Sequence, residues 1–334
     1  MKKNKKGMIV IQFNWIYVLV VGGLILALFV SVITKQRASS EMIAAGELQR
    51  RLETMLAGAI SSPGASKATN IGRAKINFDC SGFTVGDQTR PFTPGISFAP
   101  SQITVRGKDF ITWAQGWSLP YTVTNFLYVT SKRIRYVIVG DSDFANDIIS
   151  NLPEVLNFET VASLTEAETL KYKNEDRTRF VVIDLTGDLF LDSSFTNADV
   201  SALQVSSAAS SVGFYEKKPN TLEIEPKGTT LVVGIPDLYG AIFVDNLDTY
   251  ECVMKAAYRR LNLISQVFVN RTKTLKDSYP SGDDCYARYD WGSFDAMIAA
   301  TDLDPVEVGT IAANRDNIVT QNKYLQIYSC PLIY

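Results

Sequence analysis

The chain has 334 residues, of which 46% are hydrophobic and 20% charged, so it can form one large or two modest domains and is neither disordered nor collagen-like. It contains no histidine, which excludes Ser-His-Asp triads, Cys-His dyads, imidazole metal sites and a histidine pH switch within the chain. The net charge of -2 conceals an uneven distribution: residues 1–75 carry eleven Lys or Arg and three Glu, a balance of +8, and the remainder carries -10. An acidic body repels phosphate backbones, so we expect no nucleic-acid partner.

The first predicted element is a transmembrane helix over residues 8–34, preceded by a basic cytoplasmic leader at 1–7. Trp15 to Ile33 is a run of 19 residues whose only strongly polar groups are Ser31 and the hydroxyl of Tyr17. At about 1.5 Å per residue, such a run spans the roughly 30 Å hydrocarbon core of a bilayer. Four lysines precede the run and two basic residues follow it directly. This asymmetry favours a single-pass protein of the cell membrane with a cytoplasmic N-terminus and an extracellular body.

A cleaved secretory signal is the alternative reading of this segment. The apolar run is longer than the core of a typical signal peptide, and residues 34–37 (Thr-Lys-Gln-Arg) resemble a stop-transfer flank rather than a cleavage site. The sequence therefore favours an uncleaved anchor.

Residues 35–60 predict an amphipathic helical stem. The segment contains no glycine before Gly46, and the first proline follows at Pro63. Apolar residues recur at spacings of three and four, as on one face of a helix. They are Met42, Ala45, Leu48, Leu52, Leu56 and Ile60, with Met55 beside them. If the stem continues the membrane helix, the rod is roughly 80 Å long, and we expect its stripe to pack on the body or on a copy of itself.

The N-terminal sequence places a basic pair and a glycine, Lys5-Lys6-Gly7, directly before the apolar residues Met8 to Phe13. This arrangement resembles the class III signal of archaeal type IV pilin-like proteins, and the resemblance covers roughly residues 1–55. It implies cleavage after Gly7 and places Gln12-Phe13 at the family's Glu-Phe pair. Gln12 replaces the carboxylate that pairs with a neighbour's N-terminus in that family, and Met8 stands where glutamine is common. The stretch from Phe13 to Leu19 also resembles the opening of uncharacterised archaeal single-pass membrane proteins with large exported domains.

Residues 61–74 begin with Ser-Ser-Pro-Gly-Ala-Ser and predict a linker between stem and body. Residues 75–130 predict a β-rich entry region, because short β-prone segments alternate with glycine and proline turns. The expected strands lie at 75–80, 83–85 and 103–105. Aromatic residues are dense from Phe110 to Val129, and we expect a packed core or a subunit contact there rather than a ligand groove.

Residues 131–246 predict an α/β core. Three apolar strands alternate with two helices, and this βαβαβ pattern indicates a parallel sheet covered on both faces. The strands are expected at 133–140, 157–162 and 179–185, and the helices at 144–152 and 166–173. Added β-hairpins are then expected from strand-like segments at 202–205, 213–215, 221–224, 230–233 and 241–244. Residues 247–334 predict a helical C-terminal region that closes on the body, with helices at about 247–275 and 293–300.

Asp141, Asp143 and Asp184 are expected at the carboxyl ends of parallel strands, where ligands bind in such sheets. Carboxylates at that edge are candidates for holding Mg²⁺ or Ca²⁺. The alternative is that Asp141 or Ser142 caps the following helix and Asp184 orders a turn before Gly187. Because no full ligand spacing such as a calcium loop is present, we expect no metal site here.

Four cysteines, Cys80, Cys252, Cys285 and Cys330, occur without a CxxC pair. Without histidine a zinc site would need all four thiolates, and their spacing resembles no zinc ribbon. An even number on an exported body favours two disulfides. Three connectivities exist, of which we favour Cys252 with Cys285 and Cys80 with Cys330; buried free thiols are the alternative.

The chain contains no phosphate loop, no GxSxG elbow and no GxGxxG fingerprint, so we expect no enzyme and no cofactor. Only a carboxylate or Ser-Lys mechanism is left for a hydrolase. Asn270 begins a glycosylation sequon, Asn-Arg-Thr. The leading hypothesis is a membrane-anchored cell-surface structural or interaction protein that is pilin-like and self-assembles through its N-terminal helix, or else simply holds its body off the membrane. Its expected partners are membrane lipid and either copies of itself or envelope proteins. The alternative is a membrane-tethered ligand-binding or sensor module that uses the strand-edge crevice.

Overall fold

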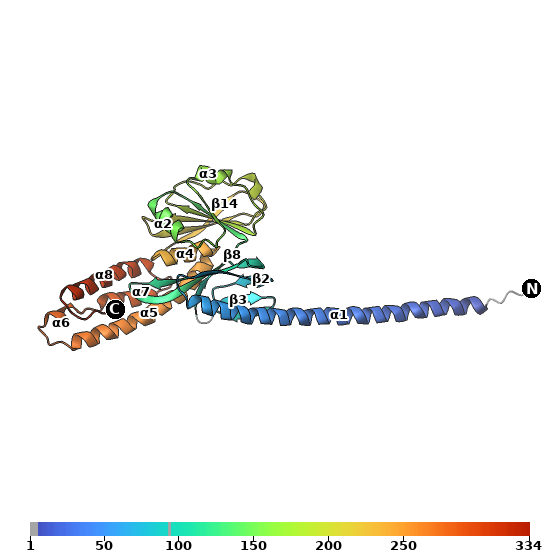
Figure 1. Ribbon diagram of the computed structural model, residues 1–334, viewed down its shortest axis with the longest axis horizontal. Helices are drawn as coiled ribbons and strands as arrows, with labels where there is room; N and C mark the ends of the chain where they lie inside the picture. Colours follow the sequence, from blue (N-terminus) through green and yellow to red (C-terminus); the bar gives the residue numbers. More distant parts are fainter. Residues whose placement is uncertain (1–5, 93–94) are drawn as a thin grey trace, which may run out of the picture.

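The computed structural model describes residues 6–92 and 95–334, with side chains outside 6–14 and 37–41. Its first element is one helix of 55 residues, α1 (Lys6–Ile60), which joins the predicted membrane segment and the predicted stem without interruption. The N-terminal part of α1 projects from the body as a rod, and its C-terminal part lies against the body (Figure 1).

Two four-stranded sheets follow α1 and form the base of the body. Their strands are β1 (Ser66–Thr69), β2 (Arg73–Phe78), β3 (Gly82–Val85), β4 (Gln88–Pro91), β5 (Ile96–Phe98), β6 (Gln102–Arg106), β7 (Phe110–Ser118) and β8 (Thr122–Ser131). One sheet has the order β1-β7-β8-β5 and the other β4-β3-β2-β6. The predicted β-rich region is therefore present, but it begins earlier than residue 75: the predicted linker at 61–74 contains β1 and the start of β2, because Ser66 to Thr69 pair with β7.

The third sheet has six strands and forms the α/β part of the body. In chain order this part contains β9 (Ile134–Val139), α2 (Asp143–Asn151), β10 (Phe158–Val161), α3 (Leu164–Thr169), β11 (Arg177–Ile183), β12 (Val200–Ser206), β13 (Ser211–Lys217) and β14 (Ile224–Leu231), with a short 3-10 turn at Ser193–Phe195. The order is β10-β9-β11-β12-β13-β14. The first four strands are parallel and the last two are added antiparallel, so the body is α/β with mixed sheets.

Helices complete the body. They are α4 (Ile235–Phe243), α5 (Leu247–Asp277), α6 (Asp284–Arg288), α7 (Gly292–Thr301) and α8 (Val308–Ile327). The last four pack at the end of the body opposite to the free part of α1, whereas α4 lies between the α/β part and β8 (Figure 1). The predicted helices near 247–275 and 293–300 correspond to α5 and α7.

Three of the predicted strands differ from the structure. Residues 241–243 belong to α4, where every residue from Asp237 to Phe243 is buried. A buried helix has no polar face to reveal its period. The predicted segments at 221–224 and 230–233 each overlap only one end of a single strand, β14, because residues 221–223 precede it and residues 232–233 follow it.

The aromatic segment is core. Trp113, Trp117, Phe126 and Tyr128 are all at most 2% exposed. Trp113 packs its ring 4.8 Å from that of Tyr239 in α4. The sheet of β7 and β8 is thus packed between α1 and the helices α4 and α5, which contact the same strands.

Two disulfides are present, as predicted, but the favoured pairing of the four cysteines is wrong. Cys80 bonds with Cys252, and Cys285 bonds with Cys330. The first joins the turn after β2 to the first turns of α5, 172 residues away, and the second ties the C-terminal segment to α6. Spacing along the chain carries no information about which of these elements become neighbours.

Candidate functional site

The apolar part of α1 has no partner within the described chain. Among the described residues, one helix is long and apolar enough to cross a membrane. The apolar segment is Trp15–Gln36, and none of it is buried. Trp15 is 69% exposed and Phe29 64%. Twenty-two residues rise about 33 Å, enough to cross the hydrocarbon core of a bilayer. This length and exposure are those of a membrane anchor or a signal segment.

The C-terminal part of α1 is built into the body. Leu52, Leu56 and Ile60 are buried, and Ala45, Leu48 and Met55 pack partly against the same core. The predicted stripe is therefore the face that docks on β3, β4, β7 and β8. Met42 is the exception, because it lies before the first docked turn and is 60% exposed.

Polar contacts fix the same junction. The Gln49 amide donates to the carbonyl of Gln88 in β4, and the Asn125 amide donates to the carbonyl of Ile60 at 2.8 Å. The guanidinium of Arg51 donates to the carbonyl of Asn70 at 3.1 Å. Because α1 is unbroken and both ends of its docked half are held, the helix passes into the body without a flexible linker.

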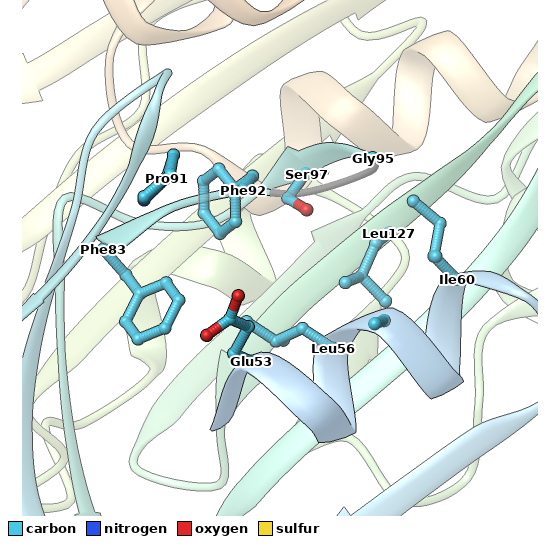
Figure 2. Close-up of a pocket in the computed structure, with 10 residues that line it drawn as sticks. Glu53, Leu56, Ile60, Phe83, Pro91, Phe92, Gly95, Ser97 and Leu127 are labelled. Carbon is cyan, nitrogen blue, oxygen red and sulfur yellow. The ribbon is translucent and has the colours of Figure 1, made fainter. Parts of the chain in front are cut away.

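The hollow at this junction is too small for a ligand. Figure 2 shows Glu53, Leu56 and Ile60 of α1 facing Phe83, Phe92 and Leu127 of the body. The enclosed volume is about 10 Å³, which is about the size of one water. A Cβ at Gly95 would lie 1.9 Å from the terminal methyl of Ile60, so a larger residue there would displace the end of that side chain. The hollow is a packing seam.

The three candidate metal ligands do not form a metal site. Ser142 caps α2, because its hydroxyl accepts a hydrogen bond from the Ala145 amide at 3.1 Å, and Asp143 lies in the first turn. Asp184 has φ of 53° and accepts hydrogen bonds from the amide and the hydroxyl of Ser207, at 2.8 and 2.7 Å. Within the described residues, no group of three Asp, Glu, Cys or His side chains has metal-binding geometry. Ser142 is therefore the helix cap, and Asp184 holds the end of the neighbouring strand through Ser207.

A larger hollow lies on the outer face of the six-stranded sheet, near the same strand ends. We call it the outer-face cavity, and its volume is about 370 Å³. Its apolar lining includes Val182, Leu189, Phe190, Ala202, Leu222 and Ile224. The strands β12, β13 and β14 pair antiparallel, so their connections need no crossover helix over the face of the sheet. The loop that includes Phe190 borders the hollow on this face. Phe190 is 62% exposed.

Two polar side chains are fixed at the floor of the outer-face cavity. The Gln204 amide nitrogen donates to the carbonyl of Leu185 at 3.2 Å, and the Tyr215 hydroxyl donates to the Gln204 amide oxygen at 2.8 Å. Asp188 and Glu223 also line the cavity. An apolar hollow with a few fixed polar groups is the usual form of a small-molecule site. Gln204 and Tyr215 could not be predicted as neighbours from the sequence, since only the pairing of β12 with β13 brings them together.

A buried carboxylate lies in the core beneath α4. Asp237 is 0% exposed, and its oxygens accept from the Val233 amide at 2.8 Å and from the Tyr250 hydroxyl at 2.5 Å. Burial raises the pKa of Asp237 to about 7, against the two hydrogen bonds, which lower it. No basic side chain pairs with it among the described residues. It is a structural acid.

The processing residues Gly7, Met8, Gln12 and Phe13 lie outside the described side chains, so the signal motif stays a prediction. Asn270 is exposed on α5, but the Thr272 hydroxyl that completes its sequon is buried and donates to the carbonyl of Phe268 at 2.7 Å. That hydroxyl is inaccessible in the folded protein.

No protein-family model, curated protein or solved structure matches the chain.

Proposed function

We propose that the protein is a membrane-anchored surface protein whose α1 holds the α/β body outside the cell and joins it to copies of the chain or to envelope components. In this proposal the N-terminus is cytoplasmic, and the class III signal is cut after Gly7, as in pilin-like proteins. The body contributes surfaces for contact rather than a reaction.

The continuity of α1 carries the proposal. Its first half exposes large apolar side chains such as Trp15 and Phe29, and its second half buries Leu52 and Leu56 in the body. At roughly 25 cal/mol per Å², exposed apolar surface of this extent requires lipid or other helices around it. A helix that is both anchor and core element also fixes the direction of the body relative to the membrane.

The two disulfides support an exported body. All four cysteines of the chain are paired, and structural disulfides persist in oxidising compartments. The anchor and the disulfides together favour a body outside the cytoplasm.

N-terminal sequencing of the protein purified from membranes tests the processing step, with co-expression of a prepilin peptidase. We expect Met8 as the first residue, and Met1 in the Gly7→Val variant, which blocks the cut. Electron microscopy of the same cells tests assembly, where we expect filaments only with the peptidase. An intact N-terminus together with a monomer in detergent would refute the pilin-like version and leave a simple anchor.

A second candidate function is ligand binding, and the outer-face cavity is the observation that favours it. The site would differ from the strand-edge crevice predicted from sequence, because Asp184 is engaged by Ser207 whereas Gln204 and Tyr215 lie in an open hollow. Thermal-shift screening of the full chain in detergent with ions, nucleotides and sugars tests it. A hit should be lost in Phe190→Ala and kept in Leu263→Ala, which removes an exposed side chain of α5. Absence of any stabilising compound would count against the candidate.

A further inference from the structure

Four turns form the end of the body that faces the membrane span. After α1 ends at Ile60, β1 runs back along the helix, so that Asn70 reaches the level of Arg51. The β3–β4 turn reaches further, because a Cβ at Gly86 would lie 3.7 Å from that of Ala45. Both turns therefore lie toward the N-terminal side of the docked part of α1.

Strand register adds the other two turns to the same end. Arg73 of β2 pairs with Arg106 of β6, and Phe110 of β7 pairs with Ser131 of β8. The amide of Lys132 donates to the carbonyl of Asp109 at 3.0 Å, which joins the two turns directly. We call the turns 70–73, 86–87, 106–109 and 131–133 the membrane-proximal rim.

The membrane-proximal rim is basic although the body is acidic. It holds five Lys or Arg and two Asp, a balance of +3, whereas residues 277–334 at the far end hold three Lys or Arg and nine Asp or Glu, a balance of -6. Arg73, Arg106, Lys108 and Lys132 are exposed. None of these four forms an ion pair within the described chain, where Arg133 alone of the rim cations is paired, with Asp176 at 2.5 Å.

The geometry of α1 brings this charge within reach of lipid headgroups. Ala45 and Arg51 lie nine and fifteen residues beyond Gln36, the end of the apolar span, so the rim begins about 14 to 22 Å along the helix from it. The headgroup layer occupies about 5 to 7 Å of that distance, and charges act over a Debye length of about 8 Å. Most of the body lies to one side of α1 (Figure 1). The average tilt of membrane helices, about 20°, is enough to lower that side toward the bilayer.

We propose that the membrane-proximal rim docks on anionic lipid headgroups and sets the tilt of the body on the membrane. The inference uses one part of the proposed function, namely that α1 spans the bilayer. Charge selects the occupant: four exposed cations without partners attract phosphate-bearing lipid, and the acidic far end is repelled from the same surface. The acidic far end of a second copy of the chain is the alternative anionic surface on which the rim could dock, and the test below distinguishes it from lipid.

The test uses the full chain in nanodiscs of phosphatidylcholine, with and without 30% phosphatidylglycerol, and hydrogen–deuterium exchange of the rim. We expect exchange at residues 106–109 and 131–133 to slow by roughly tenfold in the anionic discs, and the protection to vanish in 1 M salt. Arg73→Gln/Lys108→Gln/Lys132→Gln should remove the protection. Its matched control, Arg259→Gln/Arg260→Gln/Lys323→Gln, neutralises three exposed cations away from the rim and should retain it.

Equal exchange in the two kinds of disc would overturn the docking inference and leave the anchor intact. Protection that ignores lipid charge but requires two copies per disc would overturn it in favour of a second copy. A chain that does not incorporate into discs would refute the anchor itself, which distinguishes that failure from a failure of docking.

Discussion

Asp237 should make the protein less stable as the pH rises. Its carboxyl is 0% exposed and has a pKa of about 7, compared with 3.8 for an ordinary aspartate side chain. Below about pH 4 the group is protonated in both the folded and the unfolded chain, and its contribution to stability is fully present. Between pH 4 and 7 only the unfolded chain ionises, so the free energy of unfolding falls with pH.

The size of the effect follows from the two pKa values. Each pH unit between them costs about 1.4 kcal/mol, so the whole interval costs about 4 kcal/mol by pH 8. Asp237→Asn keeps the shape and an acceptor for the Val233 amide but cannot ionise. The variant should therefore match the wild type near pH 4 and exceed it at pH 8 by roughly 6 °C in melting temperature.

Thermal unfolding of the full chain in detergent, followed by tryptophan fluorescence between pH 4 and 8, measures this difference. Asp245→Asn is the control of opposite sign. Burial raises the pKa of Asp245, but Arg177 and Ser101 outweigh burial and hold that pKa below its usual value, so its stabilisation is lost as the pH falls. A difference between wild type and Asp237→Asn that does not change with pH would refute the reasoning.

Three further predictions concern a disulfide, core packing and a buried ion pair. Cys80→Ser opens the bond to Cys252 and should cost about 2 to 5 kcal/mol of stability in denaturant unfolding, while intact mass after alkylation shows one new free thiol. Leu52→Ala should cost about 2 to 4 kcal/mol and raise hydrogen exchange in β7 and β8, whereas Ile43→Ala on the exposed side of the same helix, where Ile43 is 70% exposed, should cost less than about 0.5 kcal/mol. Arg177→Gln leaves the buried Asp245 without its cation and should cost about 3 kcal/mol at pH 7, less at pH 3; equal losses at both pH values would contradict this.

Elements with a clear local pattern were predictable. The apolar run of α1 needs only its own composition, and the amphipathic stripe from Ala45 to Ile60 identifies the docked face. The alternation of apolar strands with helices between residues 133 and 185 correctly indicated parallel strands, because such strands are buried on both sides. The hydroxyl cap at Ser142 is equally local, since cap and capped amide are three residues apart.

Other features depend on which elements meet. The segment from Ile235 to Phe243 is apolar on every side, and such a sequence is compatible with a buried strand or a buried helix. Asp237 has an unusual pKa only because α4 is covered by β7, β8 and α5. The partners of Cys80 and Cys330 follow from contacts between turns and helices far apart in the sequence.

The sequence by itself determined that one apolar helix leads an acidic, cysteine-paired α/β body, because hydropathy, charge and strand period are properties of contiguous residues. The tertiary structure decided where those charges lie. Arg73, Arg106, Lys108 and Lys132 are spread over 60 residues of a chain whose total charge is near zero. Antiparallel pairing places their turns at one end of the body, toward the apolar span of α1, and this arrangement depends on long-range contacts rather than on composition.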